Sequence, residues 1–199
     1  MSIYPLSPCP NFQGETSYQT WEDGFTLNEC HRIINHGESL NPRPATVGND
    51  SDTSVVDSIR TSKTAWIECN KDTKWLYERL GNILRVTNGM FWKFDIRGFH
   101  EHIQYTVYEG DDKGFYRWHV DNNMQSDVPP RKLSMTVQLS DPSEYTGGEL
   151  QLHDGEVQTA VNSRGHVIIF PSYVLHRVQP VTSGIRRSLV VWANGPGFK

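Results

Sequence analysis

The sequence predicts a mainly β protein of the α+β class, in which an antiparallel β-sandwich, a jelly roll, carries N-terminal helices on one face. Two features support this prediction. Helical patterns are confined to about the first 90 residues, and from Phe91 onward the chain consists of short β-rich runs separated by Gly, Asp, Pro and Ser. Regular short strands with such turns are typical of a sandwich, and helices of an α+β domain cover one face of the sheet.

The length of the chain fits one domain. With 199 residues and a mass of 22.8 kDa, the chain can bury a substantial core without disulfides or a structural metal. We expect residues 1–199 to form a single domain, with residues 1–90 as helical and loop support and residues 91–199 as the jelly-roll core. Folding does not require oligomerisation, and the sequence leaves the oligomeric state open.

Composition argues against nucleic-acid and membrane partners. The formal net charge is −4, and no segment concentrates Lys and Arg as a phosphate-binding surface would. The N-terminal "MSIYPLSPCPNF" lacks the basic and apolar regions of a secretion signal, and no apolar run could span a bilayer. The three cysteines, Cys9, Cys30 and Cys69, lack zinc or disulfide spacing. A soluble, reduced, cytoplasmic protein is expected.

Two helices are predicted in the N-terminal part. In "FTLNECHRIINHGESL", Thr26 and Glu29 form a capping-box signature at the start of a loosely helical apolar pattern. Residues 41–53 are rich in Gly, Pro, Asn and Asp and predict an exposed loop, and "TAWIEC" beyond them predicts a short strand. A second helix is expected over residues 72–88, with its apolar side chains on one face and Gly89 near its end.

The C-terminal half predicts a series of short strands without internal repeats. The runs are "FHEHIQYTVYE", "GFYRWHV", "KLSMTVQL", "GELQLHD", "EVQTAV", "GHVIIF", "VLHRVQPV" and "RRSLVVWA". Turn residues separate them, so we expect antiparallel neighbours.

The stretch "YRWHVDNN" contains the first candidate metal ligands. His119 and Asp121 are two residues apart, and on a β-strand such residues point to the same face and can reach one point in space. A chain of this composition is expected to contain about 0.5 His-x-Asp pairs by chance, so the pair needs a third ligand. The similar "HGE" at residues 36–38 falls in the predicted helix, where positions two apart do not face each other.

Three histidines of the β half are candidates for the third ligand. His153 lies in "LHDG", where a turn with a solvated side chain is expected, and His166 opens the apolar run "VIIF" as a strand start. His176 differs from both because Arg186 follows ten residues later. The intervening "RVQPVTSGI" predicts a strand, a turn at "SG" and a return strand, and such a hairpin would bring His176 and Arg186 together.

Arg186 has the chemistry of a carboxylate anchor. Its guanidinium is a permanent charge with a planar fork that matches a carboxylate. Ser188, two residues further on, faces the same way and can donate to the same group, and Val190 and Trp192 continue this inward-facing series. Arg187 points outward and is expected in a surface salt bridge.

Three segments together resemble a known family. They are "HVD" at residues 119–121, "GGELQL" at residues 147–152 and "FPSYVLHRVQPVTSGIRRSLVVW" at residues 170–192. In order and spacing they are similar to the iron(II) and 2-oxoglutarate dependent dioxygenases, particularly the prolyl 4-hydroxylase-like branch. The resemblance covers roughly the last half of the chain and implies a double-stranded β-helix core. The chain departs from the pattern in "YEGDDKGFYRWH", which contains a small insertion.

The resemblance also implies cofactors and residue roles. It implies Fe(II), 2-oxoglutarate as cosubstrate and O2, with ascorbate as a candidate additional cofactor. Arg186 would pair with the distal carboxylate of 2-oxoglutarate, helped by Ser188 and by the hydroxyl of Tyr108. The metal ligands would be His119, Asp121 and His176.

The chemistry of these residues agrees with that implication. Two histidines and one carboxylate leave three positions of an octahedral ion open, as non-haem Fe(II) oxygenases require. A zinc hydrolase could use the same ligands but would not explain an arginine and a serine that grip a remote carboxylate. We therefore predict an oxygenase that converts 2-oxoglutarate to succinate and CO2 and hydroxylates an unactivated C–H bond. Its catalytic residues would be His119, Asp121, His176 and Arg186.

The leading hypothesis for the substrate is a peptidyl proline or a proline-like ring, from the resemblance and from the absence of a basic patch. An extended proline peptide could lie in an aromatic-lined groove, and the loops at residues 41–53 and 122–131 are candidates to close over it. Two alternatives stay open. One is an oxygenase acting on a free amino acid, a small molecule or a nucleic-acid base, and the other is a metal-bound jelly-roll binding module without turnover.

Four residues are candidates for substrate contact: Tyr116, Trp118, Arg117 and Trp192. On an ideal strand, Arg117 shares the metal-facing side with His119, while Tyr116 and Trp118 face the other way. A twist or bulge near the metal would change this assignment.

Overall fold

The structure is a computed structural model that describes residues 17–45, 56–122 and 129–197. Its helices are α1 (Leu27–Ser39), α2 (Val56–Ile59) and α3 (Lys74–Met90), and Pro142–Glu144 form a 3-10 turn, η1. The strands are β1 (Gln19–Trp21), β2 (Arg43–Pro44), β3 (Arg60–Thr61), β4 (Lys63–Ile67), β5 (Ile103–Glu109), β6 (Phe115–His119), β7 (Arg131–Gln138), β8 (Tyr145–Gly147), β9 (Leu150–Asp154), β10 (Glu156–Thr159), β11 (Val167–Pro171), β12 (Leu175–Val178) and β13 (Val181–Asn194).

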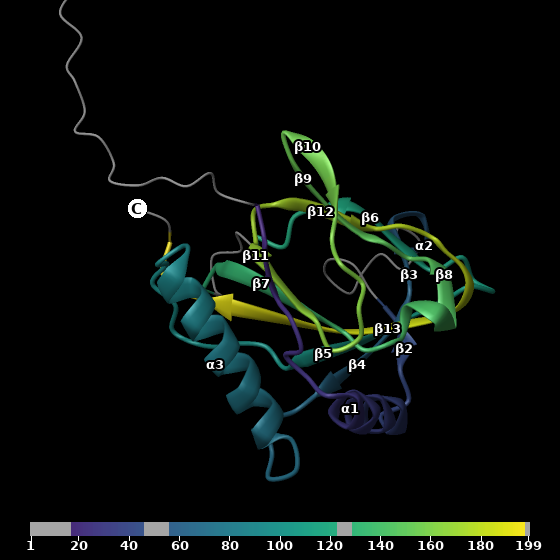
Figure 1. The fold of residues 1–199 in the computed structure, drawn as a ribbon, viewed down its shortest axis with the longest axis horizontal. Coiled ribbons are helices and arrows are strands. Elements are labelled where there is room, and N and C mark those ends of the chain that lie inside the picture. Colours follow the sequence, from purple (N-terminus) through teal and green to yellow (C-terminus); the bar gives the residue numbers. More distant parts are fainter. Residues whose placement is uncertain (1–16, 46–55, 123–128, 198–199) are drawn as a thin grey trace, which may run out of the picture.

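The strands form two antiparallel sheets that face each other (Figure 1). The larger sheet has the order β1-β11-β7-β13-β5-β4-β2, with β8 paired to the first part of β13. The smaller sheet has the order β10-β9-β12-β6-β3. Strands that are far apart in the chain are neighbours in both sheets, as in a jelly roll. The predicted fold class, a mainly β α+β protein with a double-stranded β-helix core, is confirmed.

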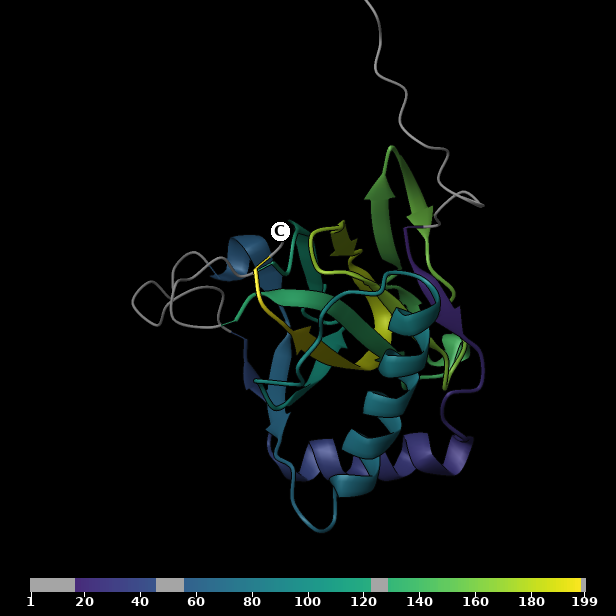
Figure 2. The same ribbon diagram turned by 90° about the vertical axis from the view of Figure 1, so that its left-hand side faces the viewer.

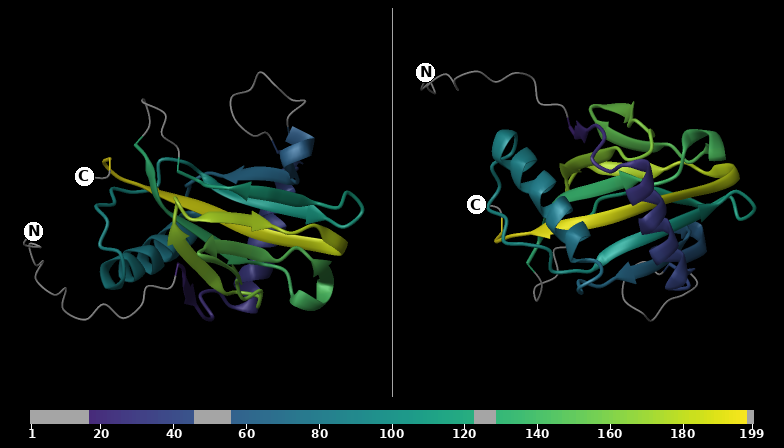
Figure 3. Two further views of the ribbon diagram at one scale, coloured as in Figure 1. Left: turned by 90° about the horizontal axis from the view of Figure 1, so that it is seen from above. Right: turned by 60° about the horizontal axis from the view of Figure 1, so that its bottom comes forward.

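Helices α1 and α3 lie across the outer face of the larger sheet (Figures 2 and 3). Their buried apolar side chains, such as Ile33 of α1 and Leu80 of α3, pack in one cluster with Ile67, Val137 and Leu189 of the strands. A second apolar cluster lies between the two sheets. The prediction that the N-terminal helices pack on one sheet is therefore confirmed.

Helix α1 packs tightly against the sheet at a glycine. A Cβ atom at Gly37 would lie 2.5 Å from a ring carbon of Tyr105 on β5, so a larger residue here would push the helix away. The next residue, Glu38, accepts hydrogen bonds from the Tyr105 hydroxyl at 2.9 Å and from Arg187 Nε at 2.7 Å. These contacts hold α1 against β5 and β13.

The start of α1 has the predicted capping box. The Thr26 hydroxyl accepts from the N–H of Glu29, and the Glu29 carboxylate accepts from the N–H of Thr26. Two otherwise unpaired backbone donors of the first turn are thereby satisfied.

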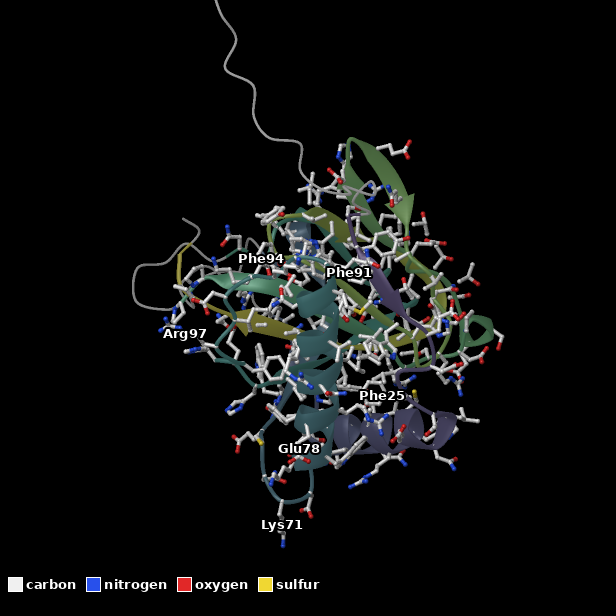
Figure 4. The ribbon with its side chains drawn as sticks, turned by 60° about the vertical axis from the view of Figure 1, so that its left-hand side comes forward. Phe25, Lys71, Glu78, Phe91, Phe94 and Arg97 are labelled. Carbon is white, nitrogen blue, oxygen red and sulfur yellow. The ribbon has the colours of Figure 1, made fainter. Side chains whose placement is uncertain are left out.

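The boundaries of α3 differ slightly from those predicted. The helix starts two residues later because Thr73 Oγ1 accepts from the N–H of Asn70 at 2.9 Å and closes a turn there. It ends one residue after Gly89, so this glycine lies inside the helix and does not mark its end. Figure 4 shows α3 with Glu78 in its first half and Phe91 just beyond its last turn. No helix in the described ranges is long and apolar enough to cross a membrane.

All eight predicted strands of the C-terminal half are present, as are the first residues of "TAWIEC" in β4. The elements β1, β2, β3, β8 and α2 were not predicted, because each is only two to four residues long and has no apolar alternation of its own. The four short strands form by pairing with other strands, so their existence depends on tertiary context.

The hairpin predicted between His176 and Arg186 is wrong. Strand β12 pairs with β6 and β9 in the smaller sheet, whereas β13 pairs with β5, β7 and β8 in the larger one. Ser183 and Gly184, predicted as the turn, lie within β13 opposite β8. The chain changes sheet between Val178 and β13. The two residues therefore come together because the two sheets face each other.

Most of the two loops predicted as lids lies outside the described residues. From the first, residues 41–45 are described and include β2, and from the second only residue 122 and residues 129–131.

Candidate metal and cosubstrate site

A cavity of about 330 Å³ lies between the two sheets. Strands β5, β7 and β13 of the larger sheet and β6 and β12 of the smaller one contribute to its walls. The residues that line it include the predicted metal ligands and Arg186, but neither His153 nor His166. His153 lies in β9 and is exposed, so it is solvated as expected but on a strand instead of a turn.

His119, Asp121 and His176 converge in this cavity. The pairing of β6 with β12 puts His176 directly opposite His119. Asp121 follows two residues after β6. Its Oδ1 lies 3.6 Å from His119 Nε2, and its Oδ2 lies 3.4 Å from His176 Nε2. One donor atom from each of the three residues lies within 4.8 Å of the others. The described part of the chain contains this one cluster with the composition of a metal site.

A backbone carbonyl orients each of the two histidines. Nδ1 of His119 lies 2.7 Å from the carbonyl oxygen of Arg117, and Nδ1 of His176 lies 2.9 Å from that of Val174. A carbonyl oxygen only accepts, so Nδ1 carries the hydrogen, and in the neutral ring Nε2 keeps its lone pair. Both lone pairs are thereby turned toward the metal position, an arrangement common among metal-binding histidines.

The Asp121 carboxylate is held by the larger sheet and by the end of β11. Ser134 Oγ on β7 donates to Asp121 Oδ2 at 2.7 Å and lies 3.0 Å from Ser172 Oγ. The N–H of Asp121 donates to the carbonyl of Ser172 at 2.9 Å. The indole nitrogen Nε1 of Trp192, which lines the same cavity, is buried and has no hydrogen-bond partner within the described residues.

The protonation states of Asp121 and His119 suit a cation, whereas His176 has to release its extra proton when an ion binds. Burial raises the pKa of the Asp121 carboxyl, but the charges of His176 and His119 and a hydrogen bond from His176 outweigh burial and hold this pKa well below its usual range. Burial, together with the neighbouring His176, lowers the pKa of His119 to about 4. Burial also lowers the pKa of His176, but the Asp121 carboxylate outweighs it and the net shift is upward. At neutral pH the carboxylate is ionised and His119 is neutral, as metal ligands must be.

These donors fit a divalent transition-metal ion. Two imidazole nitrogens and one carboxylate are the donor set of non-haem Fe(II) oxygenases, which keep the remaining coordination positions open. The donor atoms are buried or half-buried and lie close together.

Arg186 offers a second polar anchor in the same cavity. Its side chain is 2% exposed, and Nη2 donates to Gln138 Oε1 at 2.9 Å, whereas the buried Nη1 has no hydrogen-bond partner in the described chain. The guanidinium carbon lies 5.5 Å from the ring centre of Tyr108, and Ser188, 1% exposed, lines the same cavity. An unpaired buried donor is costly, and a carboxylate would accept from it. The position therefore fits a carboxylate group.

The side chain of Arg186 has room because of a neighbouring glycine. A Cβ atom at Gly148 would lie 2.9 Å from Arg186 Cδ and 2.8 Å from Val181 Cγ2. The "GGELQL" segment thus contributes space to the site through Gly148, which has a positive φ of 70°.

The predicted alternation along β13 is confirmed. The inward series from Arg186 to Trp192 lines the cavity. Arg187 points to the opposite face, where its ion pair with Glu38 is the predicted surface salt bridge.

A β-bulge in β6 reverses the sides expected for Tyr116 and Arg117. His119 pairs with His176, and Tyr116 pairs with Val178. The two paired positions are three residues apart on β6 but only two apart on β12, so β6 contains one extra residue. Tyr116 and His119 consequently lie on the same side, with their rings stacked at 3.5 Å between centroids and 18° between planes.

Two of the four candidates for substrate contact lie away from the cavity. Arg117 is exposed and does not line it, so the expectation that Arg117 shares the metal-facing side is wrong. Trp118 also lies outside, with its ring edge-on to His153 at 6.0 Å. Tyr116 and Trp192 do line the cavity.

Sequence reasoning missed several residues of the cavity. Arg131 forms an ion pair with Glu101, and its guanidinium lies 3.7 Å from the centre of the Trp192 ring. Arg60 reaches the cavity from β3. No motif marks these three charged residues, and the fold alone brings them together. Ser134 could have been found, because it alternates with apolar neighbours along β7.

Fold and site together define a jelly-roll protein with a centre of two histidines and one carboxylate. Residues 103–194 match the family model of the 2OG-Fe(II) oxygenase superfamily, and this segment contains the three donor residues and Arg186. Over this segment the chain is similar to the 2OG-Fe(II) oxygenase superfamily, and its fold resembles that of solved prolyl 4-hydroxylases.

Curated relatives match part of the chain. A PKHD-type hydroxylase from Synechococcus sp. (strain CC9902) is 47% identical over 79 residues, which are 39% of this chain and 35% of the relative. A PKHD-type hydroxylase from Psychrobacter sp. (strain PRwf-1) is 39% identical over 83 residues, which are 39% of this chain and 32% of the relative. The aligned part of the chain thus spans about a third of the length of these relatives.

Solved structures share the fold over most of the chain. A prolyl-4-hydroxylase from Pseudomonas putida has a TM-score of 0.69 at 19% identity, covering 91% of this chain and 94% of that one. A prolyl hydroxylase from Trichoplax adhaerens, in complex with a hypoxia inducible factor oxygen degradation domain peptide fragment, has a TM-score of 0.73 at 19% identity, covering 89% and 83%. At this identity the likeness establishes the fold.

Proposed function

We propose that the protein is an Fe(II)- and 2-oxoglutarate-dependent hydroxylase that oxidises an unactivated C–H bond and releases succinate and CO2. The observation that carries the proposal is Nη1 of Arg186, which has no hydrogen-bond partner among the described residues and is buried in the same cavity as the His119, Asp121 and His176 cluster. A metal site alone would not need a second anchor for an anion. A cosubstrate with one end at the metal and a distal carboxylate needs both.

The roles of the residues follow from their positions. His119, Asp121 and His176 would hold Fe(II), which when bound supplies the activation of O2 and the oxidation of 2-oxoglutarate and substrate. Arg186 pairs with the distal carboxylate of 2-oxoglutarate through Nη1, while Gln138 keeps Nη2 in place.

Neighbouring groups complete the cosubstrate position. Ser188 donates its hydroxyl to the same carboxylate as Arg186, and Tyr108, whose ring centre lies 5.5 Å from the guanidinium carbon, adds its hydroxyl. Ser134 donates a hydrogen bond to the Asp121 carboxylate, which fixes its orientation and favours its ionised form. Ascorbate remains part of the proposal as a supporting reductant.

The proposed substrate is a peptidyl proline or a proline-like ring. Support comes from the likeness in fold to prolyl hydroxylases, one of them solved with a peptide, and from the aromatic rings of Tyr116 and Trp192 in the cavity. Such rings can pack against a pyrrolidine, which presents an apolar surface of low conformational entropy. A cytoplasmic location and a single domain over residues 1–199 are part of the same proposal.

Succinate release is the primary test. The purified protein is incubated with Fe(II), 2-oxoglutarate and O2, with and without ascorbate, together with proline peptides, free amino acids or nucleosides. We expect a proline compound to stimulate succinate formation and to gain one oxygen by mass spectrometry. If only a nucleoside or an unrelated amino acid does both, the proline assignment is wrong. If no compound stimulates succinate and 2-oxoglutarate does not bind, the protein is a binding module.

A further inference from the structure

Arg60 is a buried cation that faces the cavity. It lies on β3 opposite Tyr116 of β6, and the residue is only 6% exposed. Nε donates to Ser62 Oγ at 2.7 Å, and the guanidinium carbon lies 4.8 Å from the centre of the Tyr116 ring. The residue lines the same cavity as the metal cluster.

The other arginines of the cavity have partners or an assigned role. Arg131 forms an ion pair with Glu101, and Arg186 is assigned to 2-oxoglutarate. Arg60, by contrast, forms no ion pair within the described chain. It also borders a neighbouring cavity that contains Glu109 and Asp112, but Glu109 forms an ion pair with Lys63 at 2.5 Å, and Arg60 forms an ion pair with neither carboxylate within the described residues.

Within the described residues the buried guanidinium of Arg60 has no carboxylate partner, and such an arrangement is costly. Its charge loses hydration on burial, and a hydroxyl and an aromatic ring compensate for only part of that loss. An anion that enters the cavity would supply the missing partner, and the planar fork of arginine matches a carboxylate through two parallel hydrogen bonds.

Arg60 also lies one aromatic ring away from the metal cluster. The guanidinium of Arg60 lies over the Tyr116 ring. This ring is stacked on the ring of His119, with 3.5 Å between the two ring centroids. A small molecule held by its carboxylate at Arg60 would therefore lie beside the metal ligands. The cavity, at about 330 Å³, is of the size that small-ligand sites have.

We propose that Arg60 is a specificity-determining residue that binds a carboxylate of the substrate. The proposal rests on the proposed hydroxylase function and narrows its substrate class to molecules with a carboxylate close to the ring that is oxidised. That carboxylate is either the α-carboxylate of a small imino acid derivative or the acidic side chain beside a proline in a peptide.

Two matched probe pairs distinguish these sources. The first pair is N-acetyl-L-proline and N-acetyl-L-prolinamide, which differ in the α-carboxylate. The second is a capped Asp-Pro amide and a capped Asn-Pro amide, which differ in the acidic side chain. For each probe we would measure succinate release in air and, without O2, calorimetric binding to the protein loaded with metal and 2-oxoglutarate.

The variants are Arg60→Gln, Arg60→Lys and, as a control, Arg117→Gln. Arg117 is an exposed arginine on the adjacent strand β6. We expect the unmodified protein to prefer the acid member of at least one pair by on the order of tenfold or more in affinity and in kcat/KM. Arg60→Gln should remove the preference, Arg60→Lys should keep part of it, and Arg117→Gln should keep all of it.

Binding of 2-oxoglutarate shows whether a variant is folded and separates this proposal from the hydroxylase proposal. If acid and amide probes bind equally, or if Arg60→Gln weakens both members of a pair to the same extent, Arg60 does not read a carboxylate and the inference is wrong. If no probe supports succinate release but an Arg60-dependent preference for the acid persists in calorimetry, the anion site stands and the hydroxylase assignment fails.

Discussion

The two faces of β13 differ in how far their bonding capacity is used within the described chain. On the helix side, Leu189 and Val191 are buried in the larger apolar cluster, and Arg187 is paired with Glu38. On the cavity side, Nη1 of Arg186 and Nε1 of Trp192 are both buried without a hydrogen-bond partner in the residues described. One strand thus presents a completed face and an incomplete one.

This difference separates stability from function along alternate residues. The helix side gains its free energy when the protein folds, because its apolar groups are already packed. The cavity side keeps unpaired donors that a ligand would satisfy, and such local inconsistencies are expected at functional sites. Substitutions on the helix side of β13 should change the free energy of unfolding. Substitutions on the cavity side should change ligand binding.

The largest effect is expected on the cavity side, from His176→Ala. This change removes one of three donors and the imidazole that, in its protonated form, lowers the pKa of the buried Asp121 carboxyl most among its neighbours. Stoichiometric binding of Fe(II), or of Mn(II) as a redox-stable substitute, should be lost in calorimetry. His153→Ala is the control, because His153 is exposed and outside the cavity. Unchanged metal affinity in His176→Ala, or its loss in His153→Ala, would contradict the ligand assignment.

Neighbouring arginines test the comparison most directly. Arg186→Gln should raise the dissociation constant of 2-oxoglutarate on the order of a hundredfold, because a buried charge pair loses one partner. Arg187→Gln should have little effect on this constant, since Arg187 contacts Glu38 on the opposite face. Titration of 2-oxoglutarate into the metal-loaded variants measures both. Similar losses in the two variants would refute the separation of faces.

The stability side is tested by Leu189→Ala, with Val190→Ala as its neighbour on the cavity side. Leu189 is fully buried, and leucine-to-alanine changes in a core cost about 2–5 kcal/mol. Denaturant unfolding should show this loss, while the affinity for 2-oxoglutarate per folded molecule stays the same. Val190→Ala should cost less stability. A Leu189→Ala protein with native stability and weak cosubstrate binding would contradict the comparison.

A smaller effect on the free energy of unfolding is expected at the start of α1, which packs on the helix side of the larger sheet. Thr26→Ala removes the hydroxyl that caps the N–H of Glu29, at a cost of about 1 kcal/mol. Thr26→Ser keeps the hydroxyl and should stay close to the unmodified protein in the same denaturant measurement. A loss of equal size in both variants would show that the methyl group, and not the cap, is responsible.

The smallest effect is the pH dependence of this cap. The N–H of Thr26, followed by its hydroxyl and Arg79, outweighs burial and lowers the pKa of Glu29. A lowered folded-state pKa contributes stability that is present above the unfolded value of about 4.3 and is lost as the pH falls through the folded value. The difference in unfolding free energy between the unmodified protein and Glu29→Gln should be full at pH 7 and shrink below pH 4. A difference that grows on acidification would reverse the sign of this argument.

Local patterns were sufficient for the fold and for the central residues of the site. Strand alternation and turn residues predicted the sandwich, and the same alternation correctly separated Arg186 from Arg187. The trio His119, Asp121 and His176 was predicted from spacing together with a family resemblance. The structure brings these three residues together.

What could not be predicted depends on pairing between strands distant in the chain. The bulge that places Tyr116 beside His119 exists only relative to β12, and the two-residue strand that carries Arg60 exists only through its pairing with β6. The predicted hairpin failed for the same reason, because the residues after His176 leave their sheet. A single sequence carries no direct signal for such pairings.

Gly148 shows that the position of the Arg186 guanidinium depends on a residue that has no side chain. A methyl group at this position would compete with Arg186 Cδ and Val181 Cγ2 for the same volume, although it would remove no donor and touch no charge. Arg186 supplies the positive charge that binds the carboxylate, and Gly148 leaves the space that this side chain occupies. A Gly148→Ala protein would keep every polar group of the cavity. The guanidinium of Arg186 would nevertheless be displaced, because the added methyl group would take up part of its space.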